Sequence, residues 1–191
     1  MKFILRALAI FLVRGMHPLS MVEDEHFREF IKAIDPRIEL PSRKTLSHTI
    51  LPELYAEAKA RLFTELSQAE YIALTTDCWT SLTSASYMTV TAHFLTDKIK
   101  MVSRVLCTLA VEVSHTAENL AAHLKSVTAN WRIPSEKICG VVSDNAANVR
   151  KAIVTICRWR HIQCFAHTLS LAVKDAIHDN VEFSGIILYL Q

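Results

Sequence analysis

The sequence predicts an α/β fold in which a helical segment precedes a mixed β-sheet with helices on its faces. Apolar residues follow helical spacing before residue 70, and they alternate with polar residues in the segments after it. In the last third of the chain, short apolar runs alternate with helical patterns. Hydrophobic residues make up 51% of the 191 residues, which allows a sizeable core and excludes a chain that is disordered by composition.

Residues 1–70 form the predicted helical segment. Four apolar residues share one helical face before the stretch "DPRIELPSRKTL", and five more are spaced at multiples of four after it. Ser42 is a candidate N-cap for the later helix, and Pro52 fits a kink or a first turn. The apolar positions are Phe27, Phe30, Ile31, Ile34, Leu46, Ile50, Leu54, Leu62 and Leu66.

The first twenty residues have the outline of a secretion signal, because Lys2 and Arg6 precede an apolar run. However, Arg14 closes that run, and no A-x-A cleavage site follows. The uncharged stretch Ala7–Val13 is too short to span a bilayer. We therefore predict an amphipathic or buried helix and no membrane association, with a secreted or membrane-tethered protein as the alternative.

Three strand candidates follow residue 70. "YIALTTD" ends at Asp77, "YMTVTAHF" alternates with a period of two, and "KMVSRVLCTLAVEVS" follows a polar turn at Asp97–Lys98, as in a hairpin. A helix capped by Thr116 comes next, and then the buried strand "KICGVVSDN", which ends at Asp144. The chain continues with the helix "AANVRKAIVTICRW", the short strand "HIQCFAHT" and the helix "LSLAVKDAIHD". The order β-β-β-α-β-α-β-α is that of the ribonuclease H-like fold.

In this topology the strands that end at Asp77 and Asp144 lie side by side and parallel, so both carboxylates leave the same end of the sheet. Two neighbouring carboxylates repel each other unless a cation lies between them. Mg²⁺ or Mn²⁺ is the cofactor that such an oxygen-rich pair would hold, and it serves phosphodiester chemistry. The alternative is that both aspartates are ordinary turn residues that bond their own backbone.

Charge and cysteine content give weaker evidence. The net charge of +2 gives no global argument for nucleic-acid binding, and the five cysteines form no CxxC pair. The sequence therefore predicts no zinc site. The candidate DNA-contacting residues are local, with a solvated helix face as the alternative: Arg150, Lys151, Arg158, Arg160, Arg43 and Lys44.

Five motifs in the right order resemble the hAT transposase superfamily, above all its domesticated zinc-finger BED domain-containing members. They are "DPRIELPSRKTL", "ALTTDCWTS", "YMTVTAHF", "VVSDNAANV" and "CFAHTLSLAV". The resemblance implies a ribonuclease H-like core with a D-D-E metal site, in which Asp77 and Asp144 are the first two acidic residues. It also implies that residues 1–70 are the remnant of a DNA-binding domain and that residues 71–191 are a transposase core truncated before its insertion domain.

Three parts of the family pattern have no counterpart in this sequence: the late glutamate, the BED finger and the C-terminal dimerisation region. Glu182 is too close to Asp144 to replace the glutamate. Trp79 is expected to orient the Asp77 loop by packing, with base stacking as the alternative. Cys164 and His167 match the family's C-x-x-H motif, with core packing preferred over a DNA contact.

The resemblance implies a nuclear, DNA-associated protein that is catalytically inactive and acts in DNA binding or transcriptional regulation. The alternative is an active metal-dependent DNA transferase or nuclease core within a longer chain. Protein partners fit either reading. A sheet without its covering helix would expose apolar surface, so we also predict self-association.

Overall fold

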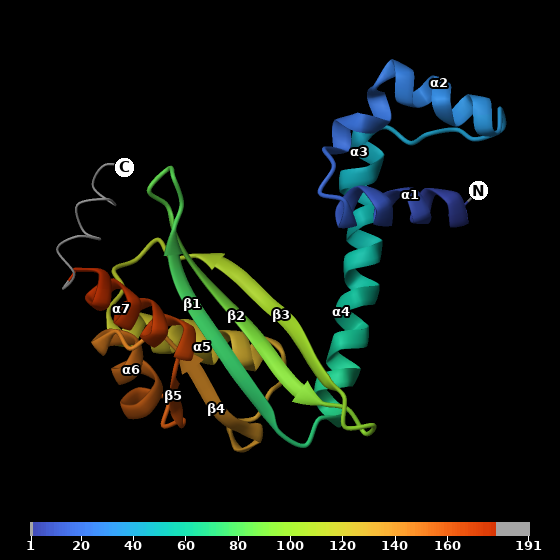
Figure 1. Cartoon of the computed structure of the whole chain (residues 1–191). Helices are drawn as coiled ribbons and strands as arrows, with labels where there is room; N and C mark the ends of the chain where they lie inside the picture. The colour runs from blue at the N-terminus through green and yellow to red at the C-terminus, as the bar shows by residue number, and fades with distance from the viewer. Residues whose placement is uncertain (1, 179–191) are drawn as a thin grey trace. The chain divides into compact units, whose positions relative to one another are not determined.

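The computed structural model describes residues 2–178, and Glu182 lies outside the described residues. The chain divides into two compact units, Met1–Leu62 and Phe63–Gln191, which we describe separately. Helices form the first unit, and a sheet with helices forms the second (Figure 1). The α/β fold with a preceding helical segment is therefore confirmed.

The first unit is a small helical cluster. Its core consists of Ala9, Leu12, Val22 and Leu46, which are completely buried. The side chains of α2 contribute nothing buried to this core, and Phe30 and Ile34 are each about 60% exposed. Its elements are α1 (Lys2–Arg14), η1 (Leu19–Glu23), α2 (Glu25–Ile34), α3 (Arg43–Thr45), η2 (Leu46–Ile50) and the first part of α4 (Leu51–Gln68).

Side-chain caps explain where these helices begin. Asp24 accepts a hydrogen bond from the Phe27 amide at 2.8 Å, and Ser42 accepts one from the Thr45 amide at 3.1 Å, as predicted for Ser42. Pro52 closely follows the π-helical turn η2, and the helical backbone is continuous from α3 through η2 into α4, so Pro52 does not start a separate helix. None of the helices within residues 2–178 has the length and apolar character needed to cross a membrane.

The second unit is built on a five-stranded mixed sheet with the order β3-β2-β1-β4-β5. β1 pairs antiparallel with β2 and parallel with β4, and β4 pairs parallel with β5. The predicted β-β-β-α-β-α-β-α order is confirmed. The elements are β1 (Ile72–Thr80), β2 (Ser86–Leu95), β3 (Met101–Ala110), α5 (Ala117–Asn130), η3 (Ser135–Lys137), β4 (Ile138–Ser143), α6 (Ala147–Lys151), η4 (Ala152–Ile156), β5 (His161–Gln163) and α7 (Phe165–His178).

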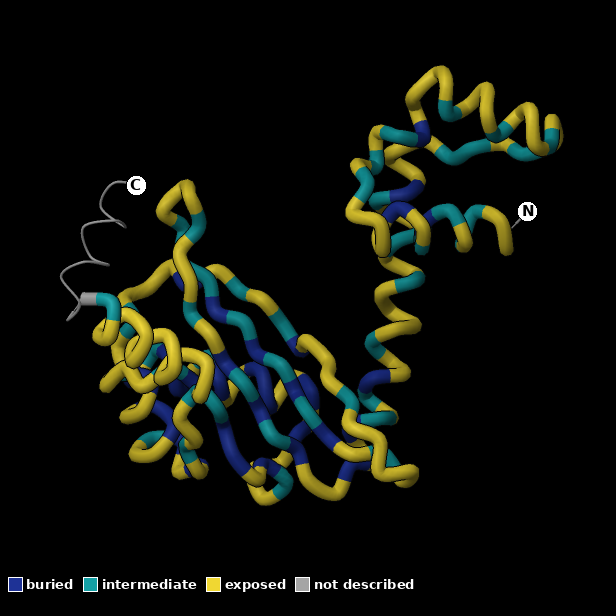
Figure 2. The backbone as a smooth tube through the Cα atoms, viewed as in Figure 1, coloured by how far each residue is buried: buried dark blue, intermediate teal, exposed yellow. Residues whose placement is uncertain are grey.

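One face of the sheet packs against α5 (Figures 1 and 2). Thr116 caps this helix through the Asn119 amide, and Leu120, Leu124 and Val127 are buried. At the end of the helix, the Trp131 indole donates to the Leu106 carbonyl of β3 at 3.0 Å. The apolar residues predicted at helical spacing in this segment are therefore the ones that pack against the sheet.

Two predicted boundaries were wrong. β1 does not end at Asp77, because its antiparallel register with β2 continues to the pair Thr80↔Ser86. The predicted strand "HIQCFAHT" is shorter, since β5 ends at Gln163 and α7 begins at Phe165. The Thr168 amide donates to the Cys164 carbonyl at 3.1 Å, which closes the first helical turn and places His167 on the helix.

Candidate functional site

Two aspartates lie at neighbouring strands of the sheet. The parallel pairing of β1 with β4 ends at Thr75↔Val142, and each strand carries its aspartate just beyond that point. Asp77 is still paired with Thr89 of β2, whereas Asp144 follows the last residue of β4. The tertiary fold thus brings two residues 67 positions apart in sequence to one end of the sheet.

Both aspartates line one pocket of about 380 Å³. The two residues of the predicted C-x-x-H motif line the same pocket, because Cys164 follows β5 and His167 lies in the first turn of α7. Hydroxyl groups of the sheet complete the wall. The lining residues include Thr76, Asp77, Ser143, Asp144, Cys164 and His167.

Both aspartates lie close enough to Cys78 to affect its thiol. Burial raises the pKa of the Cys78 thiol, and the negative charges of Asp144 and Asp77 raise that pKa further. The strand pairing brings the two aspartates to the same end of the sheet, where they line one pocket. A cation at this position would offset their mutual repulsion.

The donor atoms of the pocket fit a hydrated metal ion. Thr76 gives no support for this fit, because its side chain continues the buried face of Ile72 and Leu74, opposite Asp77 on β1, and its Oγ1 atom is buried without a hydrogen-bond partner within the described part of the chain. The donors in the pocket are mainly carboxylate and hydroxyl oxygens, which Mg²⁺ and Mn²⁺ prefer.

The pocket offers two carboxylates and no larger ligand set. Among the residues that the structure describes, no group of three or more His, Cys, Asp or Glu side chains is arranged to hold a metal ion. Cys164 and His167 therefore do not combine with the aspartates into a complete protein cage. A metal here would depend on water or a substrate for its remaining ligands.

Hydrogen bonds fix the backbone around Asp144. The Ser143 hydroxyl donates to the Asp144 carbonyl at 2.8 Å and lies 3.0 Å from His161 Nε2. On the other side of the loop, the Asn148 side chain donates to the His115 carbonyl at 2.7 Å. Sequence reasoning missed these supports.

Trp79 lies on β1 beyond the pocket. Its ring stacks on Tyr87, the residue paired with it across β1 and β2, with 4.7 Å between the ring centroids. Its Nε1 atom donates weakly to Thr89 at 3.5 Å, and Thr89 is the residue opposite Asp77. Trp79 therefore packs beside the Asp77 position while 44% of it stays exposed.

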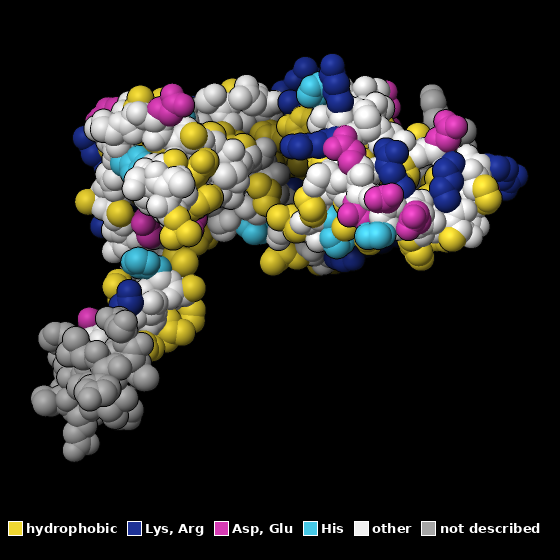
Figure 3. All heavy atoms as spheres, turned by 90° about the horizontal axis from the view of Figure 1, so that it is seen from above, with side chains coloured by type: hydrophobic (Ala, Val, Ile, Leu, Met, Phe, Trp, Pro, Cys, Tyr) yellow, Lys and Arg dark blue, Asp and Glu magenta, His cyan; other side chains and the backbone are white. Residues whose placement is uncertain are grey.

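The six predicted cationic residues do not line the pocket as the structure describes it. Arg150, Arg158 and Arg160 are exposed on and after α6, whereas Lys151 forms an ion pair with Glu118 at 2.9 Å. Arg43 and Lys44 belong to the first unit. Figure 3 shows both basic and acidic side chains on the face seen in this view.

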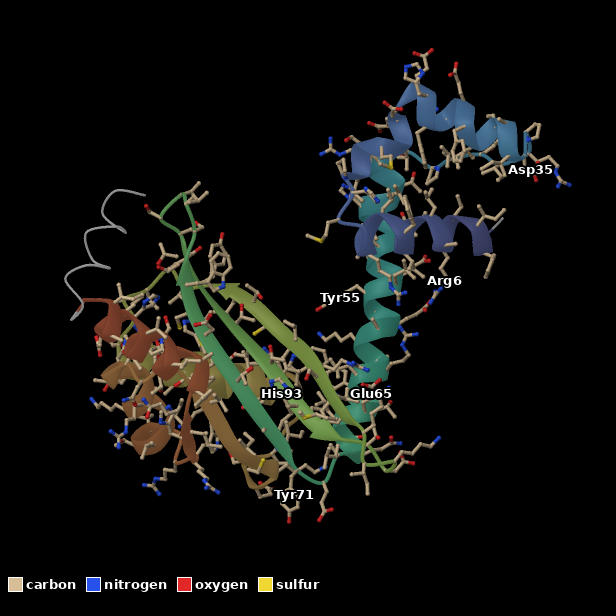
Figure 4. All side chains as sticks on the ribbon, viewed as in Figure 1. Arg6, Asp35, Tyr55, Glu65, Tyr71 and His93 are labelled. Atoms are coloured by element: carbon tan, nitrogen blue, oxygen red, sulfur yellow. The ribbon has the colours of Figure 1, made fainter. Side chains whose placement is uncertain are left out.

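A second and larger cavity of about 990 Å³ lies at the opposite end of the sheet. It is lined by the start of β1, the end of β2 and the last turn of α4, including Glu65, Tyr71 and His93 (Figure 4). The His93 ring lies 3.1 Å from the Thr75 hydroxyl and 2.8 Å from the Ser103 hydroxyl. Both ring nitrogens of His93 are thus satisfied within the sheet.

Comparison with known proteins supports the sequence-based resemblance. Residues 75–165 match the ZBED1 RNase-like domain, a range that includes both aspartates and Cys164. The chain is 29% identical over 188 residues to a putative AC transposase of Zea mays. That alignment covers 91% of this chain and 23% of the transposase. It is 27% identical over 193 residues to zinc finger BED domain-containing protein 6 of Homo sapiens, covering 93% and 20%.

A third relative extends the range of described roles. The putative transcriptional regulator tpeD of Talaromyces stipitatus is 29% identical over 185 residues, which is 89% of this chain and 22% of that protein. The chain spans less than a quarter of the length of these relatives. The predicted resemblance to transposases and to BED zinc-finger proteins is confirmed, and the residues that match the RNase-like domain lie in the second unit.

Proposed function

We propose that the RNase-like domain is a transposase-derived module of a nuclear, DNA-associated protein, in which Asp77 and Asp144 hold Mg²⁺ or Mn²⁺ against a DNA phosphate. One observation carries this proposal. The two aspartates come from neighbouring strands and line a single pocket at one end of the sheet. The names of the relatives, which include a transposase and a transcriptional regulator, support the DNA-associated role.

The role of each group follows from its charge. Asp77 and Asp144 supply the negative charge that attracts a hard divalent ion. When bound, the ion supplies positive charge to phosphate oxygens that two carboxylates alone would repel. Exposed Arg150, Arg158 and Arg160 lie on and after the helix that follows Asp144, and they would attract the phosphate backbone over a longer range.

The site favours DNA binding, with a part in transcriptional regulation, over strand cleavage. Two-metal phosphodiester chemistry needs carboxylates that hold two ions about 4 Å apart. The described pocket presents two carboxylates and no third acidic residue. The similarity to proteins named as transposases favours one alternative, an active DNA transferase or nuclease core within a longer chain.

A manganese titration tests the metal site. Mn²⁺ binding to the whole chain is measured by calorimetry and by electron paramagnetic resonance, for the native sequence, Asp77→Asn, Asp144→Asn and the double variant. We expect each single variant to bind Mn²⁺ at least tenfold more weakly. Asp97→Asn is the matched control, because Asp97 is an exposed aspartate at the far end of the same sheet. Equal binding by the native chain and the double variant would refute the metal site.

A second assay tests the DNA role. Fluorescence anisotropy of a short labelled duplex should show binding that strengthens with Mn²⁺ and weakens with salt. Arg150→Gln, Arg158→Gln and Arg160→Gln together should reduce the salt dependence, whereas Lys151→Gln should do so less because Lys151 already pairs with Glu118. Metal-dependent strand cleavage by this chain would favour the catalytic alternative. A tagged chain excluded from the nucleus would contradict the proposed location.

A further inference from the structure

We infer that His161 is a positioning residue that holds Asp144 in its metal-binding place through the Ser143 hydroxyl. This inference rests on the proposed function of Asp77 and Asp144, and it assigns a role to a residue outside their pocket lining. Its basis is a chain of hydrogen bonds that begins on β5, passes through the end of β4 and ends on the backbone of Asp144.

The fold makes this contact local although the residues are distant in sequence. β4 and β5 pair in parallel, with Val141 opposite His161 and Ser143 opposite Gln163. Ser143 is the last residue of β4 and is 2% exposed, so its hydroxyl must find partners within the protein. The Ser143 carbonyl also accepts a hydrogen bond from the Cys164 amide at 2.8 Å, which joins the two strand ends.

The proton count at Ser143 determines what His161 must do. A serine hydroxyl has a single proton to donate, and here it points to the Asp144 carbonyl at 2.8 Å. The 3.0 Å contact with His161 Nε2 must then be a bond that His161 donates to Ser143 Oγ. If Nε2 accepted instead, the hydroxyl proton would turn toward the ring and the Asp144 carbonyl would lose its donor. His161 therefore sets the direction of the Ser143 hydroxyl.

This arrangement matters for the site because Asp144 has few other restraints. Its carboxylate receives only a long contact of 3.4 Å from the Ala146 amide among the described hydrogen bonds. The remaining support is on the backbone, where the Ser143 hydroxyl bonds the carbonyl of Asp144 itself. Partners of metal ligands commonly change metal affinity by about tenfold to a hundredfold when they are removed.

Paired substitutions at His161 separate hydrogen bonding from packing. His161→Gln places an amide Nε2 donor at the same distance along the side chain, whereas His161→Leu fills the space without a donor. Ser143→Ala removes the relay, and the double variant Ser143→Ala/His161→Leu completes a thermodynamic cycle. All are tested in the whole chain by Mn²⁺ titration and by amide hydrogen exchange at Cys164, whose N–H bonds Ser143.

We expect His161→Leu to weaken Mn²⁺ binding by roughly tenfold or more and to speed exchange at Cys164, and His161→Gln to restore both. The double variant should be no worse than Ser143→Ala alone. Equal losses in His161→Gln and His161→Leu would reduce His161 to a packing residue and overturn the inference.

The exchange measurement separates this inference from the proposed function. If the native chain binds no Mn²⁺, the proposed metal site is wrong. Faster exchange at Cys164 in His161→Leu, restored in His161→Gln, would still show that His161 holds the Ser143–Asp144 backbone. If His161→Leu leaves both exchange and Mn²⁺ affinity unchanged, the inference is wrong even where the native chain binds the metal.

Discussion

The two cavities at opposite ends of the sheet differ in size and in what their walls offer. The larger one, of about 990 Å³, is formed where β1 begins and β2 ends, and its wall mixes exposed Tyr71, Leu95 and Met101 with carboxylates. The smaller one, of about 380 Å³, lies beyond the parallel pairing of β1 with β4. Only the smaller one gathers Asp77 and Asp144.

The comparison shows that the candidate site lies where the parallel strands β1 and β4 end, and not in the cavity with the larger volume. Ligands of open α/β sheets bind beyond the carboxyl ends of the parallel strands. The smaller pocket has that position and gathers the two aspartates that follow the last β1–β4 pair. Around the larger cavity, polar groups such as His93 are already paired within the protein. We therefore expect substitutions there to alter stability, and substitutions at the smaller pocket to alter binding.

The largest effect on stability should come from Lys137, which supports the wall of the larger cavity. Its ammonium group donates to the Ser67 and Ala69 carbonyls, both at 2.8 Å, at the end of α4. Lys137→Met should lower the free energy of unfolding by roughly 2 kcal/mol, because hydrogen bonds from a charged donor are lost. Urea unfolding measures this, with Lys125→Met on the exposed surface of α5 as control. A parallel loss of Mn²⁺ affinity would break the separation between the two cavities.

Adjacent threonines on β1 should respond to the same substitution with opposite signs. Thr75→Val removes the hydroxyl 3.1 Å from His93 Nε2 and should cost about 1 kcal/mol in unfolding free energy. Thr76→Val replaces an unpartnered buried hydroxyl and should stabilise the chain by about 1 kcal/mol. Mn²⁺ affinity should not change, because the Thr76 side chain lies on the face of β1 opposite Asp77. Destabilisation by both variants would mean that Thr76 is satisfied in solution.

The positions that follow one sequence period could be predicted, and so could the strand order that brings the two aspartates to one end of the sheet. Alternation fixed which residues of β2 face the core, and the helical spacing of Leu120, Leu124 and Val127 predicted the covering helix. The convergence of Asp77 with Asp144 followed from the strand order alone. Thr76 carried a usable signal as well, because it is two residues beyond Leu74 on the buried side of β1.

Other features depend on contacts that leave no pattern in the sequence. β1 continues past Asp77 because its hairpin pairing with β2 outlasts its parallel pairing with β4. The hydrogen bond between His161 and Ser143 joins residues 18 positions apart through the register of β4 with β5. A one-residue slip of that register would remove the bond, so no local propensity could have indicated it.

A smaller effect is expected for the ion pair on the wall of the larger cavity. Glu65 lies 3.1 Å from Arg104 Nε, and both side chains are more than a third exposed. Solvent screens such pairs, so Glu65→Gln should change the free energy of unfolding by about 0.5 kcal/mol or less. Mn²⁺ affinity should not change. A clear loss of Mn²⁺ binding in this variant would show that the larger cavity contributes to the site after all.

The smallest effect is a rate, and it reports directly on the carboxylate pair. The pKa of Cys78 is raised by burial and then by the charges of Asp144 and Asp77, so Asp144→Asn should lower that pKa and increase the thiolate fraction at pH 8. Alkylation of Cys78, followed by mass spectrometry of its peptide, should accelerate roughly twofold, because lower nucleophilicity offsets part of the gain. Cys107 is the internal control, since burial raises its pKa and no carboxylate contributes.

Mn²⁺ added to the native chain should also accelerate the alkylation of Cys78, because the ion neutralises the charges that suppress the thiolate. An acceleration in Asp144→Asn but not with Mn²⁺ would confirm that Asp144 lies near Cys78 while denying that the carboxylates hold the ion.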